Sequence, residues 1–117
     1  MIKGGTMTTE VDAIYLSRGD ARTWTADTDV GGSSHMLFDH ERAKAGLWKA
    51  DPDDPRGLVE VEIPARETIL VLEGSVRVTI DRGTPYELQA GDMLSISERS
   101  LVGWDPTPDC IVFWAYS

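Results

Sequence analysis

The sequence predicts a single all-β domain, built as a barrel or sandwich of short strands. Short runs of alternating apolar and polar residues recur about every eight to twelve positions from Ala13 onward, and turn residues separate them. The chain has 117 residues, which is enough for one hydrophobic core and too few for two. Apolar residues make up 41% of the chain and charged residues 26%, as in an ordinary folded protein.

The expected strands follow one another with turn-forming clusters rich in Gly, Pro, Asp and Ser between them. They are 13–16, 22–25, 35–38, 45–49, 58–63, 68–73, 75–80, 85–88, 93–96, 101–104 and 111–116. The only plausible helix is 39–44, which is too short to form without packing. Residues 1–12 are polar, contain a second possible start at Met7, and are predicted to be a flexible leader. The barrel domain is therefore predicted to span 13–117.

Charge and composition exclude several classes of partner. The formal net charge is -9, so a basic surface for nucleic acid or an anionic membrane is not expected. No apolar run approaches the roughly 20 residues that span a bilayer, and no signal peptide opens the sequence, so we expect a cytoplasmic protein. Cys110 is the only cysteine, which excludes an intrachain disulfide and a cysteine-rich zinc site.

Two segments resemble the two sequence motifs of the cupin superfamily. The first is Thr68-Ile-Leu-Val-Leu-Glu-Gly74 followed by Ser75-Val-Arg-Val-Thr-Ile80, and the second is Leu88-Gln-Ala-Gly-Asp92 followed by Met93-Leu-Ser-Ile96. With Ala45-Gly-Leu-Trp48, Gly103-Trp104 and Phe113-Trp-Ala-Tyr116, the chain is similar to cupins related to ureidoglycine aminohydrolase and to ethanolamine-utilisation proteins. The resemblance implies a jelly-roll β-barrel over roughly 45–117, and it says less about function because one fold hosts many functions.

The framework residues of this resemblance have structural roles. Gly74 falls where two strands of a hairpin meet, and Gly91 precedes an aspartate in a tight turn, both places where a residue without Cβ can take a positive φ. Asp92 is expected to cap its turn by accepting backbone N–H bonds.

The resemblance also implies a divalent metal held by histidines and a glutamate, and here the chain departs from it. In the family, two histidines separated by one residue stand three or four residues before the glutamate that corresponds to Glu67. In this chain the positions at the four-residue spacing are Glu60 and Glu62, and those at the three-residue spacing are apolar. The third histidine position falls at Val102. Because imidazole ligands suit Zn, Fe, Cu and Ni, their absence argues against those metals.

Two interpretations of the acidic trio Glu60, Glu62 and Glu67 stay open. In the strand Val-Glu-Val-Glu-Ile, either the glutamates or the apolar residues point into the barrel. Glutamates in water are the ordinary arrangement, since buried carboxylates are costly. Inward glutamates would instead hold Mg²⁺ or Mn²⁺ or keep one carboxyl protonated for acid/base chemistry.

The histidines and tryptophans are further candidates. His35 and His40 have no recognisable ligand spacing, but segment 31–40 could fold over the barrel mouth, where a histidine would act as acid or base. The tryptophans are expected to fill the core, an interface or the walls of a pocket, and they are Trp24, Trp48, Trp104 and Trp114. Cys110 is expected to be a buried small hydrophobe.

Three functions remain open. The preferred one is a small-molecule enzyme of isomerase, lyase or cyclase type without a histidine-bound metal or other cofactor. Glu67 and His40 are its catalytic candidates, and its pocket residues are Trp48, Glu60, Glu62, Val102 and Trp104. The second is a non-catalytic ligand-binding module or sensor. The third is an Mn or Mg enzyme of aminohydrolase-like or kinase-like chemistry that uses the acidic trio. A homodimer is expected in each case, because an apolar strand such as 111–116 is hazardous at an exposed edge.

Overall fold

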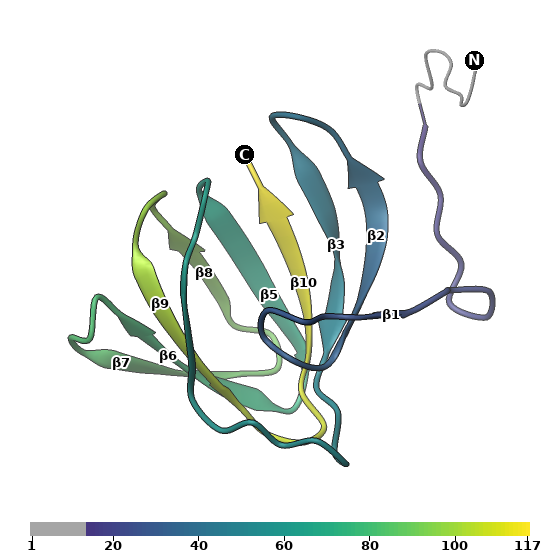
Figure 1. Ribbon diagram of the computed structural model, residues 1–117. Helices are drawn as coiled ribbons and strands as arrows, with labels where there is room; N and C mark the ends of the chain where they lie inside the picture. Colours follow the sequence, from purple (N-terminus) through teal and green to yellow (C-terminus); the bar gives the residue numbers. More distant parts are fainter. Residues whose placement is uncertain (1–13) are drawn as a thin grey trace.

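The computed structural model describes residues 14–117, which form two antiparallel β-sheets that face each other (Figure 1). The described residues contain no helix, so the all-β prediction is confirmed. One sheet has six strands, in the spatial order β1 (Thr25–Ala26), β2 (Ser33–Asp39), β3 (Lys44–Lys49), β10 (Ile111–Tyr116), β5 (Glu67–Glu73) and β8 (Met93–Ile96). The other has four strands, in the order β4 (Val59–Glu62), β9 (Leu101–Pro106), β6 (Ser75–Ile80) and β7 (Pro85–Gln89).

The chain changes sheet at several connections along its path, as in a jelly roll. Alternation within each strand places one set of side chains between the sheets. Ile69 and Val71 of β5 and Val76 and Val78 of β6 are each at most 3% exposed and share one apolar core with Val102 of β9. Ile69 and Val76 of this core also border the cavity that forms the candidate site.

The turn predictions hold where glycine is needed. Gly74 has φ +67°, and a Cβ there would lie 2.7 Å from Asp109 Oδ1 and 2.9 Å from the Cα of Cys110. Asp92 accepts a hydrogen bond from the backbone N–H of Gln89 at 2.8 Å, as expected of a turn cap.

Three predicted elements are wrong. Residues 14–16 form no strand, because no neighbouring strand pairs with them and their side chains are exposed. The strand expected at 22–25 shortens to Thr25–Ala26, where pairing with β2 begins. The short helix expected at 39–44 is a hairpin turn, because Asp39 pairs with Lys44 across strands and the His40 N–H donates to the carbonyl of Ala43 at 2.9 Å. The predicted leader 1–12 and Ala13 lie outside the described residues.

The strand 111–116 is not an edge strand, contrary to expectation. As β10 it lies between β3 and β5 and pairs with both, so its backbone is satisfied within the sheet. The argument for a homodimer from this strand is therefore lost, and the homodimer stays a prediction. Residues 14–117 contain no helix that is long and apolar enough to cross a membrane.

Candidate functional site

An open cavity of about 1150 Å³ lies between the two sheets. Inward-facing residues of β4, β5, β9 and β10 form its walls, and the segment that carries β1 also lines it, with Thr25 and Ala26. Val112, Trp114 and Tyr116 line the cavity together because alternate residues of β10 share a face. By the same alternation, Glu67 and Ile69 of β5 project into it.

The side of β4 that faces the cavity is apolar. Val59 and Val61 line the wall. Glu60 projects outward, where its carboxylate accepts hydrogen bonds from Arg82 Nη2 at 3.0 Å and Nε at 3.1 Å. The hydrogen bond from Arg82 lowers the pKa of Glu60, so this carboxylate is an ordinary surface ion. Glu62, at the end of the strand, is exposed and borders the cavity.

Glu67 is the buried ionisable group of the cavity. Its side chain is 8% exposed, and in the part of the chain that the structure describes it has no hydrogen-bond or ion-pair partner. Burial raises the pKa of Glu67 from 4.5 to about 7, because the charged form loses its hydration without gaining a counter-charge. The protonated and ionised forms of the Glu67 carboxyl are therefore both populated near neutral pH.

Tyr116 lies beside Glu67, its direct cross-strand partner. Burial raises the pKa of Tyr116 to about 12, and the nearby charges of Glu67, Asp27 and Asp29 add to the effect. The phenol thus keeps its proton at neutral pH and is available as a hydrogen-bond donor. The Tyr116 ring is inclined against that of Trp114, with 5.3 Å between centroids.

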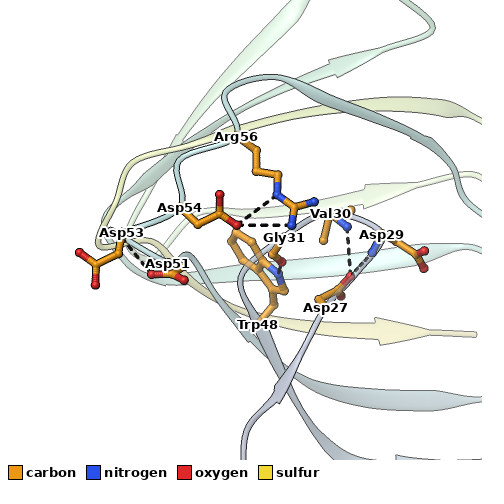
Figure 2. A network of polar contacts seen from close by, with 9 residues as sticks. All are labelled: Asp27, Asp29, Val30, Gly31, Trp48, Asp51, Asp53, Asp54 and Arg56. Carbon is orange, nitrogen blue, oxygen red and sulfur yellow. Dashed lines mark hydrogen bonds and ion pairs between the residues drawn. The ribbon is translucent and has the colours of Figure 1, made fainter.

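Two loops meet over Trp48 at one side of the cavity. The indole N–H of Trp48 donates to the carbonyl of Gly31 at 2.8 Å, and Arg56 pairs with Asp54 at 3.4 Å beside it (Figure 2). A Cβ on Gly32 would lie 2.8 Å from the Trp48 ring, so a side chain there would displace it.

The turn before β2 is held by Asp27. Its Oδ1 accepts the backbone N–H groups of Asp29 at 2.9 Å and of Val30 at 3.0 Å (Figure 2). Its Oδ2 accepts the hydroxyl of Ser34 at 3.2 Å. These bonds fix the loop that carries Asp29 to the cavity wall.

The two histidines have different places. His35 lines the cavity, with Nδ1 2.9 Å from the carbonyl of Thr23 and Nε2 2.6 Å from the hydroxyl of Ser17. Because a carbonyl can only accept, Nδ1–H donates to the Thr23 carbonyl, and Nε2 accepts a hydrogen bond from the Ser17 hydroxyl. Both ring nitrogens are therefore hydrogen-bonded. His40, the predicted catalytic histidine, is exposed, bonds to the hydroxyl of Tyr15 and does not line the cavity.

Two predicted pocket residues lie elsewhere. Trp48, Glu62 and Trp104 border the cavity, whereas Glu60 faces solvent and Val102 is fully buried in the apolar core. Alternation along β4 turns Glu60 outward, and the neighbouring side chains of the apolar core cover Val102 completely.

The acidic trio does not converge, because Glu60 points away from Glu67. Within 14–117 no group of three His, Cys, Asp or Glu side chains is arranged to hold a metal ion. The side chains that accompany Glu67 on the cavity walls of β5 and β10 are Ile69, Val112, Trp114 and Tyr116, of which only Tyr116 is polar enough to offer an oxygen. The imidazole of His35 also lines the cavity, but both of its nitrogens are hydrogen-bonded within the protein. These residues do not fit the divalent metal that the resemblance implies.

Sequence reasoning missed Tyr116, left Trp114 open between the core, an interface and a pocket wall, and missed the turn at Asp27 and Asp29. Alternation along 111–116 was a sufficient signal for the first two, since it places Trp114 and Tyr116 on the same face as the apolar Val112. No local signal identifies the turn, because its place depends on the path of a loop across the barrel.

Comparison with known proteins agrees with this architecture. The family model for the EutQ-like cupin domain matches residues 39–107, more than half of the chain. The chain belongs to the EutQ-like cupin family. The match covers the Glu67 strand and the motifs that resemble the cupin superfamily, and it ends before Trp114 and Tyr116.

Three solved structures of other proteins show the same fold. A putative ethanolamine utilization protein Q from Salmonella typhimurium is 18% identical, with a TM-score of 0.70 over 92% of this chain and 88% of that one. An RmlC-like cupin from Shewanella frigidimarina is 19% identical, with a TM-score of 0.69 over 90% of this chain and 91% of that one. A conserved protein of unknown function from Streptococcus pyogenes is 12% identical, with a TM-score of 0.67 over 92% and 96%. No curated protein matches this EutQ-like cupin in sequence.

Proposed function

We propose that this EutQ-like cupin is a small-molecule enzyme in which Glu67 transfers protons inside the barrel. The reaction class is isomerase, lyase or cyclase, without a histidine-bound redox metal. The observation that supports it is the buried carboxyl of Glu67, which lines the cavity without a partner among the described residues and has a pKa of about 7. A general acid or base works best when its pKa lies near the operating pH.

The surrounding residues give each step a physical basis. In its ionised form Glu67 takes a proton from a substrate carbon or oxygen, and the resulting carboxylic acid returns that proton to another substrate atom. Tyr116 keeps its own proton because its pKa is about 12, so its role is to donate a hydrogen bond to a substrate oxygen or nitrogen. Trp104, Trp114 and Ile69 line the cavity with apolar surface, which reduces the hydration of the reacting groups.

A non-catalytic ligand-binding module is the second candidate, and it is favoured by the size of the cavity and by its aromatic lining, neither of which requires proton transfer. A ureidoglycine aminohydrolase-like or kinase-like Mn or Mg enzyme has less support, since Glu60 is paired with Arg82 outside the cavity. A cytoplasmic location and a homodimer belong to the proposal as expectations from the sequence.

Solvent deuterium incorporation tests the proposal. Pools of small metabolites are incubated in D₂O with the protein and with the Glu67→Gln variant, and mass spectrometry follows each compound. We expect at least one compound to gain carbon-bound deuterium or to change its mass with the native protein, and not with Glu67→Gln. Glu73→Gln, at the exposed end of the same strand, is the matched control and should behave as the native protein does.

The opposing result is equally defined. A compound that shifts the melting temperature of the native protein, yet is recovered unchanged and without deuterium, identifies the ligand-binding module instead. Turnover that persists in Glu67→Gln would show that Glu67 does not transfer the proton.

A further inference from the structure

The charges on the cavity wall are strongly unbalanced. Among the described residues, one lysine and one arginine line it, and both are paired: Lys44 with Asp39 at 3.3 Å and Arg56 with Asp54 at 3.4 Å. The one histidine on the wall, His35, has both ring nitrogens hydrogen-bonded within the protein. Six further carboxylates line it, namely Asp27, Asp29, Asp51, Glu62, Glu67 and Asp105. Among residues 14–117, the wall therefore offers an anionic ligand no unpaired ammonium or guanidinium, whereas a cationic ligand meets an excess of negative charge.

A buried carboxylate makes this excess more than a solvated acidic surface. Glu67 is 8% exposed and faces the cavity without a hydrogen-bond or ion-pair partner in the described chain. Its neighbour Tyr116 lies in the combined negative field of Glu67, Asp27 and Asp29. Burying a carboxylate is costly unless a counter-charge accompanies it, and here a ligand is the available source of that charge.

Aromatic rings supply the second half of a cation site. Trp104, Trp114 and Tyr116 border the same cavity, and the faces of such rings attract ammonium groups. Outside the cavity, Trp24 already has the ammonium of Lys49 over its ring at 4.2 Å. Of the tryptophans on the cavity wall, none has a lysine or arginine of the described residues in that position.

We propose that the cavity binds a small organic cation, a primary amine or substituted ammonium, with its positive charge beside Glu67 and against Trp114 and Tyr116. This inference rests on the proposed function for the role of Glu67 in proton transfer, and it names the substrate class of that site as organic amines. The binding site itself depends only on the cavity, its charges and its rings.

Three probes with the same four-carbon chain and different head groups test the proposal: butylamine, butanol and butyrate. Binding is followed at about pH 8 by NMR titration of the tryptophan indole N–H signals. We expect butylamine to bind at least tenfold more tightly than butanol, a difference of about 1.4 kcal/mol, and butyrate to bind least. In Glu67→Gln the affinity for butylamine falls by tenfold or more, while Glu73→Gln keeps it. Trp114→Leu, which leaves the carboxylates in place, weakens butylamine more than butanol.

The proposal is overturned if butanol or butyrate binds as tightly as butylamine, if butylamine does not bind at millimolar concentrations, or if Glu67→Gln and Trp114→Leu both keep its affinity. Its failure is separable from that of the proposed function. If deuterium transfer to a neutral or anionic compound depends on Glu67, the proposed enzyme is supported and the amine is ruled out as its substrate class. If butylamine binds selectively but no amine gains deuterium, the cation site is supported and the proposed enzyme is ruled out.

Discussion

The buried carboxyl of Glu67 makes the stability of the protein depend on pH in a way that one substitution can isolate. The pKa of Glu67 is about 7 in the folded protein, against 4.5 for an ordinary glutamate. The folded state therefore binds this proton more tightly than the unfolded state does. The contribution of Glu67 to stability is therefore fully present below about pH 4.5, decreases as the pH rises from 4.5 to about 7, and is lost above about pH 7.

The size of the effect follows from the same two values. A rise from 4.5 to about 7 in the pKa corresponds to roughly 3 kcal/mol of stability lost between acid and neutral pH. Glu67→Gln keeps the shape of the protonated side chain and cannot ionise, so it does not incur this loss. At about 4 °C per kcal/mol for a domain of this size, its melting temperature should exceed that of the native protein by roughly 10 °C at pH 8 and be similar at pH 4.

Differential scanning fluorimetry at several pH values, with urea denaturation at the two extremes, measures this difference. Glu73→Gln serves as the control, because its exposed carboxylate should leave the difference from the native protein nearly constant. The reasoning is refuted if the difference between Glu67→Gln and the native protein does not change with pH, or if it becomes larger toward acid.

Three other substitutions or probes test the fold around the site. Gly74→Ala should lower the free energy of unfolding by about 2 kcal/mol or more in urea denaturation, because φ is +67° and a Cβ would clash with Asp109 and Cys110. Gly57→Ala is the control and should lower it by less, since a Cβ there contacts nothing. Equal losses in the two variants would contradict the clash. Val102→Ala should cost about 2 kcal/mol in the same assay, since the side chain is fully buried; a loss of less than about 0.5 kcal/mol would show that it is not packed. The thiol of Cys110 should react with a disulfide reagent only on unfolding, because burial and Asp109 raise its pKa to about 11; rapid labelling of the folded protein at pH 8 would oppose this.

Regular alternation explains most of what the sequence predicted correctly. The strands 75–80, 93–96 and 111–116 have the predicted bounds, because each is a short run with β-branched or aromatic residues between turn residues. The cupin fold and the similarity to ethanolamine-utilisation cupins were likewise predicted from motifs in β5, β6 and β8 and the turns beside them, whereas the relation to ureidoglycine aminohydrolase stays a prediction.

The errors are at places where tertiary pairing decides. Residues 14–16 have the composition of a strand but no neighbour to pair with, and 39–44 has helix-forming residues within a hairpin that β2 and β3 close. His40 was predicted as catalytic from its position in a loop, but the hairpin carries it away from the cavity and His35 lies on the wall instead. Sequence patterns give the faces of a strand and not the course of the loop between two strands.

The direction of Glu67 was accessible to the same alternation, and it shows why this carboxyl differs from Glu60. Glu67 precedes Ile69 and Val71 at steps of two, so it shares their buried face, whereas Glu60 alternates with valines that occupy the inner face of β4. The burial that makes Glu67 costly to the fold is the same burial that brings its pKa to about 7. A change that gives Glu67 a cationic partner or admits water should therefore stabilise the protein at neutral pH and lower the pKa together. An amine bound beside Glu67 is such a partner, so butylamine should raise the melting temperature more at pH 8 than at pH 5, where Glu67 is largely protonated and has little charge to pair.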